Sequence, residues 1–178
     1  MQEPVGGLLA LDLATVVGWA TCPLDYRPRT PLEVRHLGPA AGVFHGSWRV
    51  APVGTPLAPF LDRFATGLDN MIALHAPSIL VFEAPIMHAG HTSIDTARRL
   101  MGMACVTELI AYRRQIATVR ECNVATVKKH WTGSGRAEKA DMIRAARERG
   151  FEPKDDNAAD ALALMDLAAA SFLKRRAA

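Results

Sequence analysis

Four acidic residues, from three distant parts of the chain, have the setting of metal ligands. Asp12 interrupts the apolar run LLALDLATVVGWA, and Glu83 directly follows the run SILVF. Asp156 and Asp160 open the stretch DDNAADALAL near the C-terminus. Carboxylates in apolar surroundings are costly to bury unless something compensates them, and a divalent cation does so, because Mg²⁺ prefers carboxylate and phosphate oxygens. We therefore predict phosphodiester chemistry on a nucleic acid, with Mg²⁺ as cofactor and Mn²⁺ able to replace it.

Convergence of these residues requires strand ends to meet the start of a helix. Two-metal phosphoryl transfer uses ions about 3.5–4 Å apart, which need carboxylates from several directions. Asp156 and Asp160 are four residues apart and share one helix face, and Asn157 can face the same way. Asp155 or Asp156 can instead cap this helix. The candidate catalytic and metal-binding residues are Asp12, Glu83, Asp156, Asn157 and Asp160.

The overall composition is that of an ordinary globular protein, but its charge is unevenly placed. The 178 residues are 49% hydrophobic and 22% charged, which fits a single domain spanning 1–178. Residues 113–149 carry a net charge of +6, while the whole chain carries only +3. A basic segment beside an acidic cluster suits a protein that binds backbone phosphates and cleaves a phosphodiester bond. The alternative interpretation is a solvated helical face.

Several other classes of protein are disfavoured. Three distant cysteines without a CxxC pair argue against a zinc site and a disulfide framework. No run reaches the roughly 18 uncharged apolar residues of a membrane span, and MQEPVGG lacks the features of a signal peptide. We therefore expect a cytoplasmic protein with no membrane partner.

Hydrophobic periodicity predicts an α/β fold with a mixed five-stranded sheet whose first three strands are antiparallel. Four prolines in 23–39 predict a loop there. In the second long helix, Ile94 and Leu109 are expected at inner positions. The predicted strands are 8–13, 16–22, 41–50, 78–82 and 116–119. The predicted helices are 55–75, 93–114, 123–131, 137–149 and 156–174.

Motifs along most of the chain resemble, in order, those of the RuvC-type Holliday junction resolvases, which have an RNase H-like fold. LALDLATVVGWA resembles the first-strand motif, with Asp12 and Gly18 in place. FEAP resembles the second acidic motif, with Glu83 as ligand, and TARRLMGMACV resembles the long helix with its packed Gly102. NAADALAL resembles the last acidic motif, with Asp160.

The basic segment also resembles this family. In VKKHWTGSGRAEKADM, Lys128 and Lys139 keep the family's spacing of eleven residues. The resemblance implies that Lys139 is catalytic, contacting the scissile phosphate or stabilising charge in the transition state, and that Lys128 holds a backbone phosphate. The residues expected to contact DNA are Lys128, Lys129, Arg136, Lys139, Ile86, Met87 and His88.

Two departures from the family pattern are of the kind seen in phage and prophage relatives. Asn157 stands where the family commonly carries an aspartate, so either Asp156 replaces that ligand or Asn157 ligates through its amide oxygen. Ile86, followed by Met87, stands where the family commonly has an aromatic residue that intrudes at the junction. An apolar wedge can still serve that purpose.

The resemblance implies a metal-dependent endonuclease that resolves four-way DNA junctions by paired cuts, leaving a 5′-phosphate and a 3′-hydroxyl. A symmetric junction needs two coordinated cuts, so we expect a homodimer with twofold symmetry. Two alternatives stay open. One is an RNase H-like nuclease acting on flaps, single strands or hybrids. The other is a junction-binding protein whose catalytic site is weakened at Asn157.

Overall fold

The five strands form one mixed sheet. The computed structural model describes residues 6–37, 42–86 and 92–176. The strand order is β3-β2-β1-β4-β5. β1 pairs antiparallel with β2, β2 pairs antiparallel with β3, and β4 and β5 run parallel to β1. The predicted sheet is therefore confirmed. The strands are β1 Gly7–Asp12, β2 Val16–Pro23, β3 Phe44–Arg49, β4 Ile79–Glu83 and β5 Thr118–Cys122.

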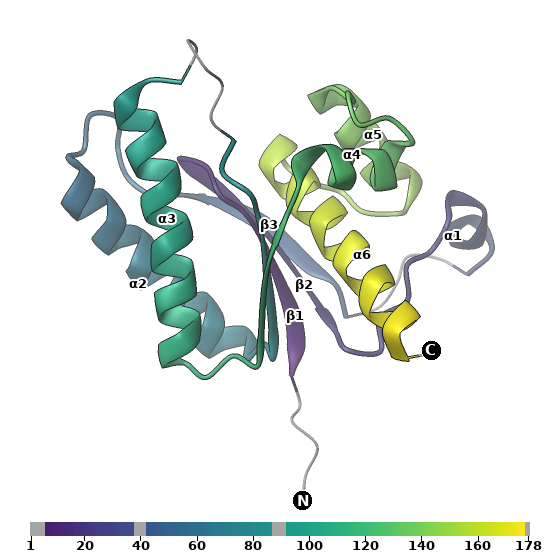
Figure 1. Ribbon diagram of the computed structural model, residues 1–178. Helices are drawn as coiled ribbons and strands as arrows, with labels where there is room; N and C mark the ends of the chain where they lie inside the picture. The colour runs from purple at the N-terminus through teal and green to yellow at the C-terminus, as the bar shows by residue number, and fades with distance from the viewer. Residues whose placement is uncertain (1–5, 38–41, 87–91, 177–178) are drawn as a thin grey trace, which may run out of the picture.

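Helices cover both faces of this sheet (Figure 1). The helices α2 Leu57–His75 and α3 Ile94–Arg113 lie on one face, and α6 Asp156–Arg176 lies across the other with α4 Val124–Thr132 and α5 Lys139–Glu148. Alternate residues of β1 feed two separate cores, because successive side chains of a strand point to opposite faces. Leu9 and Leu11 pack under α2 and α3, whereas Leu8 and Ala10 pack under α6.

Helix ends follow capping signals in the sequence. The Ser93 side chain accepts a hydrogen bond from the Thr96 amide at 3.1 Å and caps α3. Asn123 caps α4, as predicted, and accepts from the Ala125 amide at 2.9 Å. Gly102 lies where α3 meets α2, and a Cβ there would stand 2.9 Å from Leu61 Cδ1. This glycine therefore serves close helix packing.

The predicted loop 23–39 is wrong in part, because it contains the helix α1 Pro31–Leu37. The Glu33 amide donates to Thr30 Oγ1 at 3.3 Å, and the Thr30 amide donates to Glu33 Oε2 at 2.7 Å. This is a capping box of the form T-x-x-E, with Pro31 at the first helical position, where proline is favoured. The prolines mark the start of a short helix there.

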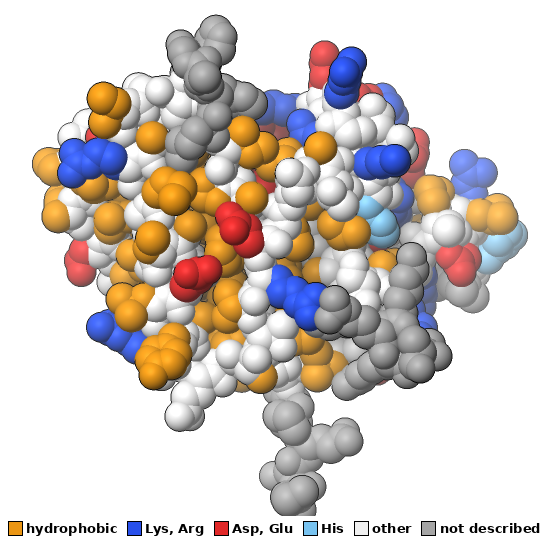
Figure 2. All heavy atoms as spheres, viewed as in Figure 1, with side chains coloured by type: hydrophobic (Ala, Val, Ile, Leu, Met, Phe, Trp, Pro, Cys, Tyr) orange, Lys and Arg blue, Asp and Glu red, His pale blue; other side chains and the backbone are white. Residues whose placement is uncertain are grey.

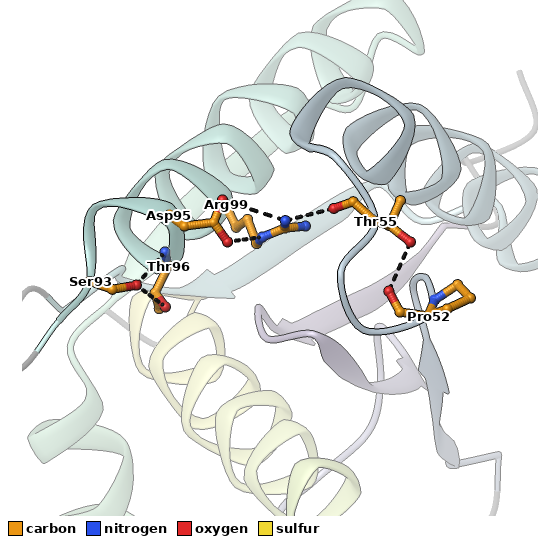
Figure 3. Close-up of polar contacts among 6 residues, drawn as sticks. All are labelled: Pro52, Thr55, Ser93, Asp95, Thr96 and Arg99. Atoms are coloured by element: carbon orange, nitrogen blue, oxygen red, sulfur yellow. Dashed lines mark hydrogen bonds and ion pairs between the residues drawn. The ribbon is translucent and has the colours of Figure 1, made fainter.

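A polar network joins α3 to the connection before α2 (Figure 3). Arg99 Nε donates to Asp95 Oδ2 at 2.7 Å, and Arg99 Nη2 donates to the Thr55 carbonyl at 2.7 Å. The guanidinium also stacks 4.7 Å from the centre of the Phe60 ring. Thr55 Oγ1 in turn donates to the Pro52 carbonyl at 2.8 Å. Arg99 thus fixes the start of α3 against α2.

The helices of the described ranges are too short or too polar to cross a membrane.

Candidate active site

Asp12 and Glu83 lie side by side because β1 and β4 are parallel neighbours. Leu11 pairs with Phe82 in the sheet register, so the next residue of each strand is a carboxylate at the same sheet edge. Asp12 lies two residues after Ala10, and Glu83 two residues after Val81. The side chains of both acids therefore point to the same face of the sheet as Ala10 and Val81, the face that α6 covers. Their side chains share a hydrogen bond. The structure thus brings together two acids separated by 71 positions in the sequence.

The start of α6 completes the acidic cluster. Asp156 is the first residue of α6, and Asp160 lies one turn later. Asp155 caps the helix, because its Oδ1 accepts from the Ala158 amide at 2.9 Å. Of the two candidate caps, the structure therefore selects Asp155. The negative charge of Asp160 acts on both Asp12 and Glu83, so the four acids form one electrostatic group.

Burial and mutual repulsion raise the pKa values of the central acids. Burial raises the pKa of Asp12 well above its usual range, and the charges of Glu83 and Asp160 raise it further. Burial and the charge of Asp160 raise the pKa of Glu83 to about 7. Burial raises the pKa of Asp160 to about 6. A cluster that resists its own ionisation in this way is suited to binding a cation.

Two lysines flank the cluster. The Lys139 ammonium, whose side chain is 80% exposed, forms an ion pair with Asp156. The hydrogen bond within this ion pair raises the pKa of Lys139 and lowers the pKa of Asp156. Lys128 Nζ donates to the Ala137 carbonyl at 2.9 Å, and its charge lowers the pKa values of Glu83 and Asp160. Both lysines therefore supply positive charge beside the carboxylates.

Asn157 faces Asp12 with its amide group. With the amide nitrogen turned inward, Nδ2 donates to Asp12 Oδ2 and to the Val16 carbonyl, both at 3.2 Å. In this orientation Asn157 orients Asp12 from the start of α6.

The donor set fits a hard divalent cation. Asp160 Oδ1 is buried and finds no hydrogen-bond partner among the described residues. An orphaned carboxylate oxygen beside two further carboxylates is a natural ligand for Mg²⁺. Across the described ranges, however, no three His, Cys, Asp or Glu side chains already stand around one point as a metal site.

Three of the other residues expected to contact DNA lie in the part of the chain that the structure describes. Lys129 on α4 and Arg136 in the turn before α5 are exposed. Ile86, three residues after Glu83, is 38% exposed. Met87 and His88 lie outside the described residues. Sequence patterns did not point to Ser47 on β3, whose hydroxyl donates to Asp155, because only the strand register brings the two together.

Comparison with known proteins identifies relatives by sequence. No family model matches the chain. The chain is 36% identical to the crossover junction endodeoxyribonuclease RuvC of Anaeromyxobacter dehalogenans (strain 2CP-C) over 129 residues, which cover 72% of this chain and 65% of that protein. It is also 36% identical to the RuvC of Halorhodospira halophila over 128 residues, covering 70% and 73%. The match to the first of these relatives thus spans slightly less than two thirds of its length.

Solved structures show the same fold. The Thermus thermophilus RuvC structure superposes with a TM-score of 0.69 at 14% identity, covering 94% of this chain and 96% of that chain. The same protein in complex with a Holliday junction substrate gives 0.71 at 15% identity. The yeast mitochondrial Holliday junction resolvase gives 0.62 at 10% identity, covering 98% and 83%. The sheet and its covering helices are therefore RNase H-like, and the sequence relatives show that the chain belongs to the RuvC family.

Proposed function

We propose that this chain is a metal-dependent endonuclease that resolves four-way DNA junctions by paired phosphodiester hydrolysis. The observation that carries the proposal is the meeting of Asp12, Glu83 and Asp160 at one end of the sheet, with pKa values raised by burial. Membership of the RuvC family supports the substrate, because relatives carry the name crossover junction endodeoxyribonuclease.

The proposed metal ligands come from three elements. Asp12 ends β1, Glu83 ends β4, and Asp160 projects from α6. Asp156 joins them when its ion pair with Lys139 opens, and Asn157 joins if its amide turns its oxygen inward. Bound Mg²⁺, or Mn²⁺ in its place, would supply the charge that activates water and stabilises the leaving oxygen. We expect the protein to require one of these ions for cutting.

The surrounding residues position the DNA. A water oxygen forms a new bond to phosphorus while the bond to O3′ breaks, leaving a 5′-phosphate and a 3′-hydroxyl. Lys139 is exposed beside the acids, so its ammonium can meet the scissile phosphate and stabilise the charge that develops there. The half-buried Lys128 would place its positive charge beside the carboxylates and bind a backbone phosphate.

We propose further DNA contacts in addition to the two lysines. Lys129 and Arg136 are exposed and would neutralise backbone phosphates. Ile86 is a partly exposed apolar residue at the start of the segment after β4, and it would wedge between bases at the junction. We extend the wedge to Met87 and assign a DNA contact to His88, the two residues that follow Ile86 in sequence.

A homodimer is proposed through the outer face of α3. Figure 2 shows apolar side chains gathered over this helix, where Ile94 is 80%, Met101 50%, Leu109 46% and Tyr112 82% exposed. Ile94 and Leu109 were expected in the core, but α3 turns them outward. Large apolar side chains along one exposed helix face favour pairing with a second copy, and two copies would present two active sites to a symmetric junction.

The deciding experiment is cleavage of a labelled mobile four-way junction in Mg²⁺. We expect paired symmetric nicks from the wild type, and none from Asp12→Asn or in EDTA. A linear duplex of the same sequence and a flap substrate serve as matched controls. Equal cutting of the flap would favour the broader RNase H-like alternative. Junction binding without any cutting in Mg²⁺ or Mn²⁺ would instead identify a junction-binding protein.

A further inference from the structure

Three residues form a row across the sheet under the start of α6. Asp12 pairs with Gly18 on β2, and Gly18 pairs with Ser47 on β3. Paired residues of neighbouring strands point to the same face, and here that face is the one that α6 covers. The row therefore holds a carboxylate of the cluster, a glycine and a hydroxyl in consecutive strands.

Gly18 allows α6 to lie directly on the sheet. A Cβ at this position would fall well inside van der Waals contact of the Asn157 carbonyl oxygen. The backbone of the first turn of α6 therefore lies directly against Gly18, with no room for a side chain between them. This contact limits movement towards the sheet, but it does not stop the helix start from sliding along the row or lifting away.

Ser47 adds a restraint on these movements. Its hydroxyl donates to Asp155 Oδ2, while the other carboxylate oxygen of Asp155 accepts from the Ala158 amide at 2.9 Å. Asp155 thus uses one oxygen to cap α6 and the other to anchor that cap to β3. Lys154 Nζ adds a parallel link by donating to the Ser47 carbonyl at 2.8 Å.

We propose that Ser47 and Asp155 are a positioning pair that sets the start of α6 over Asp12, so that Asp160 and Asp156 reach the same cation. The inference rests on the proposed metal site. Each residue of helix turns the next side chain by about 100°, so a shifted first turn would aim Asp156 and Asp160 away from Asp12. Partners behind metal ligands typically change metal affinity or activity by roughly 10- to 100-fold.

The test measures Mn²⁺ binding by calorimetry without DNA, and the Mg²⁺ concentration for half-maximal junction cleavage. Ser47→Ala removes the anchor. Asp155→Ser keeps a good helix cap, but its side chain is too short to reach β3. We expect each variant to weaken Mn²⁺ binding by roughly tenfold or more, and to raise the half-maximal Mg²⁺ concentration while the rate at saturating Mg²⁺ recovers. The double variant should bind Mn²⁺ only slightly more weakly than either single variant, because both substitutions break the same link between Ser47 and Asp155.

Controls separate positioning from folding. Ser47→Thr keeps the hydroxyl and should restore Mn²⁺ affinity. Ser171→Ala removes a hydroxyl that donates within α6, to the Leu167 carbonyl at 2.9 Å, and should leave Mn²⁺ affinity unchanged. Melting temperature and junction binding, both in EDTA, should match the wild type for Ser47→Ala.

Each outcome bears on a distinct claim. Unchanged Mn²⁺ affinity in both Ser47→Ala and Asp155→Ser would overturn the positioning pair. An equal loss of affinity in Ser47→Thr would also overturn it, because the hydroxyl would then not be the cause. A wild type that binds Mn²⁺ but leaves junctions intact would overturn the proposed function alone. A wild type that binds no Mn²⁺ would overturn both.

Discussion

Lys139, at the start of α5, forms an ion pair with Asp156, the first residue of α6. The pair joins the basic segment to the acidic cluster, although 17 positions separate the two residues. Because Lys139 is exposed while Asp156 is half-buried, the lysine is the partner that can leave to meet DNA. The ion pair thus holds the proposed catalytic lysine beside the proposed metal site before substrate arrives.

We expect Lys139→Ala to lower the single-turnover rate of junction cleavage by roughly 100-fold, as for loss of one donor to a charged transition state. Junction affinity in EDTA should change far less, because many phosphate contacts remain. Arg144→Ala, on the same helix and paired with Asp141, is the matched control and should cut normally. A Lys139→Ala variant with the wild-type rate would remove this residue from catalysis.

Metal-free stability should fall as pH rises towards neutrality. The pKa of Glu83 is raised from 4.5 to about 7, so between these values the folded chain retains a proton that the unfolded chain has lost. The free energy of unfolding then decreases with increasing pH. The melting temperature in EDTA should therefore drop between pH 5 and pH 7.5, and saturating Mg²⁺ should reverse the drop.

Glu83→Gln isolates this effect. Glutamine has nearly the same shape but does not titrate, so the difference in melting temperature between wild type and variant should grow as pH rises. Asp160, whose pKa is raised to about 6, should contribute in the same direction. A difference independent of pH would show that Glu83 does not titrate in this window.

Gly18→Ala should displace the start of α6. The added methyl would collide with the Asn157 carbonyl, which is rigid helix backbone. We expect a lower melting temperature and loss of Mn²⁺ binding measured by calorimetry. Gly102→Ala is the control, because its methyl meets the flexible end of Leu61, away from the acids. Equal Mn²⁺ affinity in Gly18→Ala and wild type would contradict the close approach.

Leu109→Asp should separate the proposed dimer, because it places a charge in the apolar face of α3 that a second copy would bury. Light scattering after gel filtration should report a monomer, and junctions should receive single nicks in place of paired ones. Leu74→Asp, at a 74% exposed position on α2, should stay dimeric. The α3 interface fails if the wild type is monomeric on junction DNA or if Leu109→Asp remains a dimer.

Junction affinity should depend steeply on salt. If about 5 phosphates are neutralised, log K should fall against log salt with a slope of roughly −4 to −5. Lys129→Ala should make the slope shallower by about 1, whereas Arg63→Ala, on α2 across the sheet, should leave it unchanged. A wild-type slope near zero would argue against DNA as the partner.

Local signals predicted the strands and long helices well, because each depends on residues close in sequence. β5 was expected at 116–119 but runs from Thr118 to Cys122. Gln115 takes a left-handed conformation with φ of 56°, and the Ile116 amide donates back to Ala111, so the chain closes α3 before the strand begins. The missed helix α1 did carry a local signal, the T-x-x-E box, which its prolines obscured.

The sequence by itself determined the fold class and the acidic residues, because apolar periodicity fixes elements and carboxylates stand out at their ends. Only the tertiary structure decided how those acids meet: strand register sets Asp12 beside Glu83, and Gly18 lets α6 bring Asp160 over them. It also decided that Asp155 caps α6 while Asp156 pairs with Lys139. These relations depend on contacts between residues distant in sequence, whose free energies no local pattern encodes.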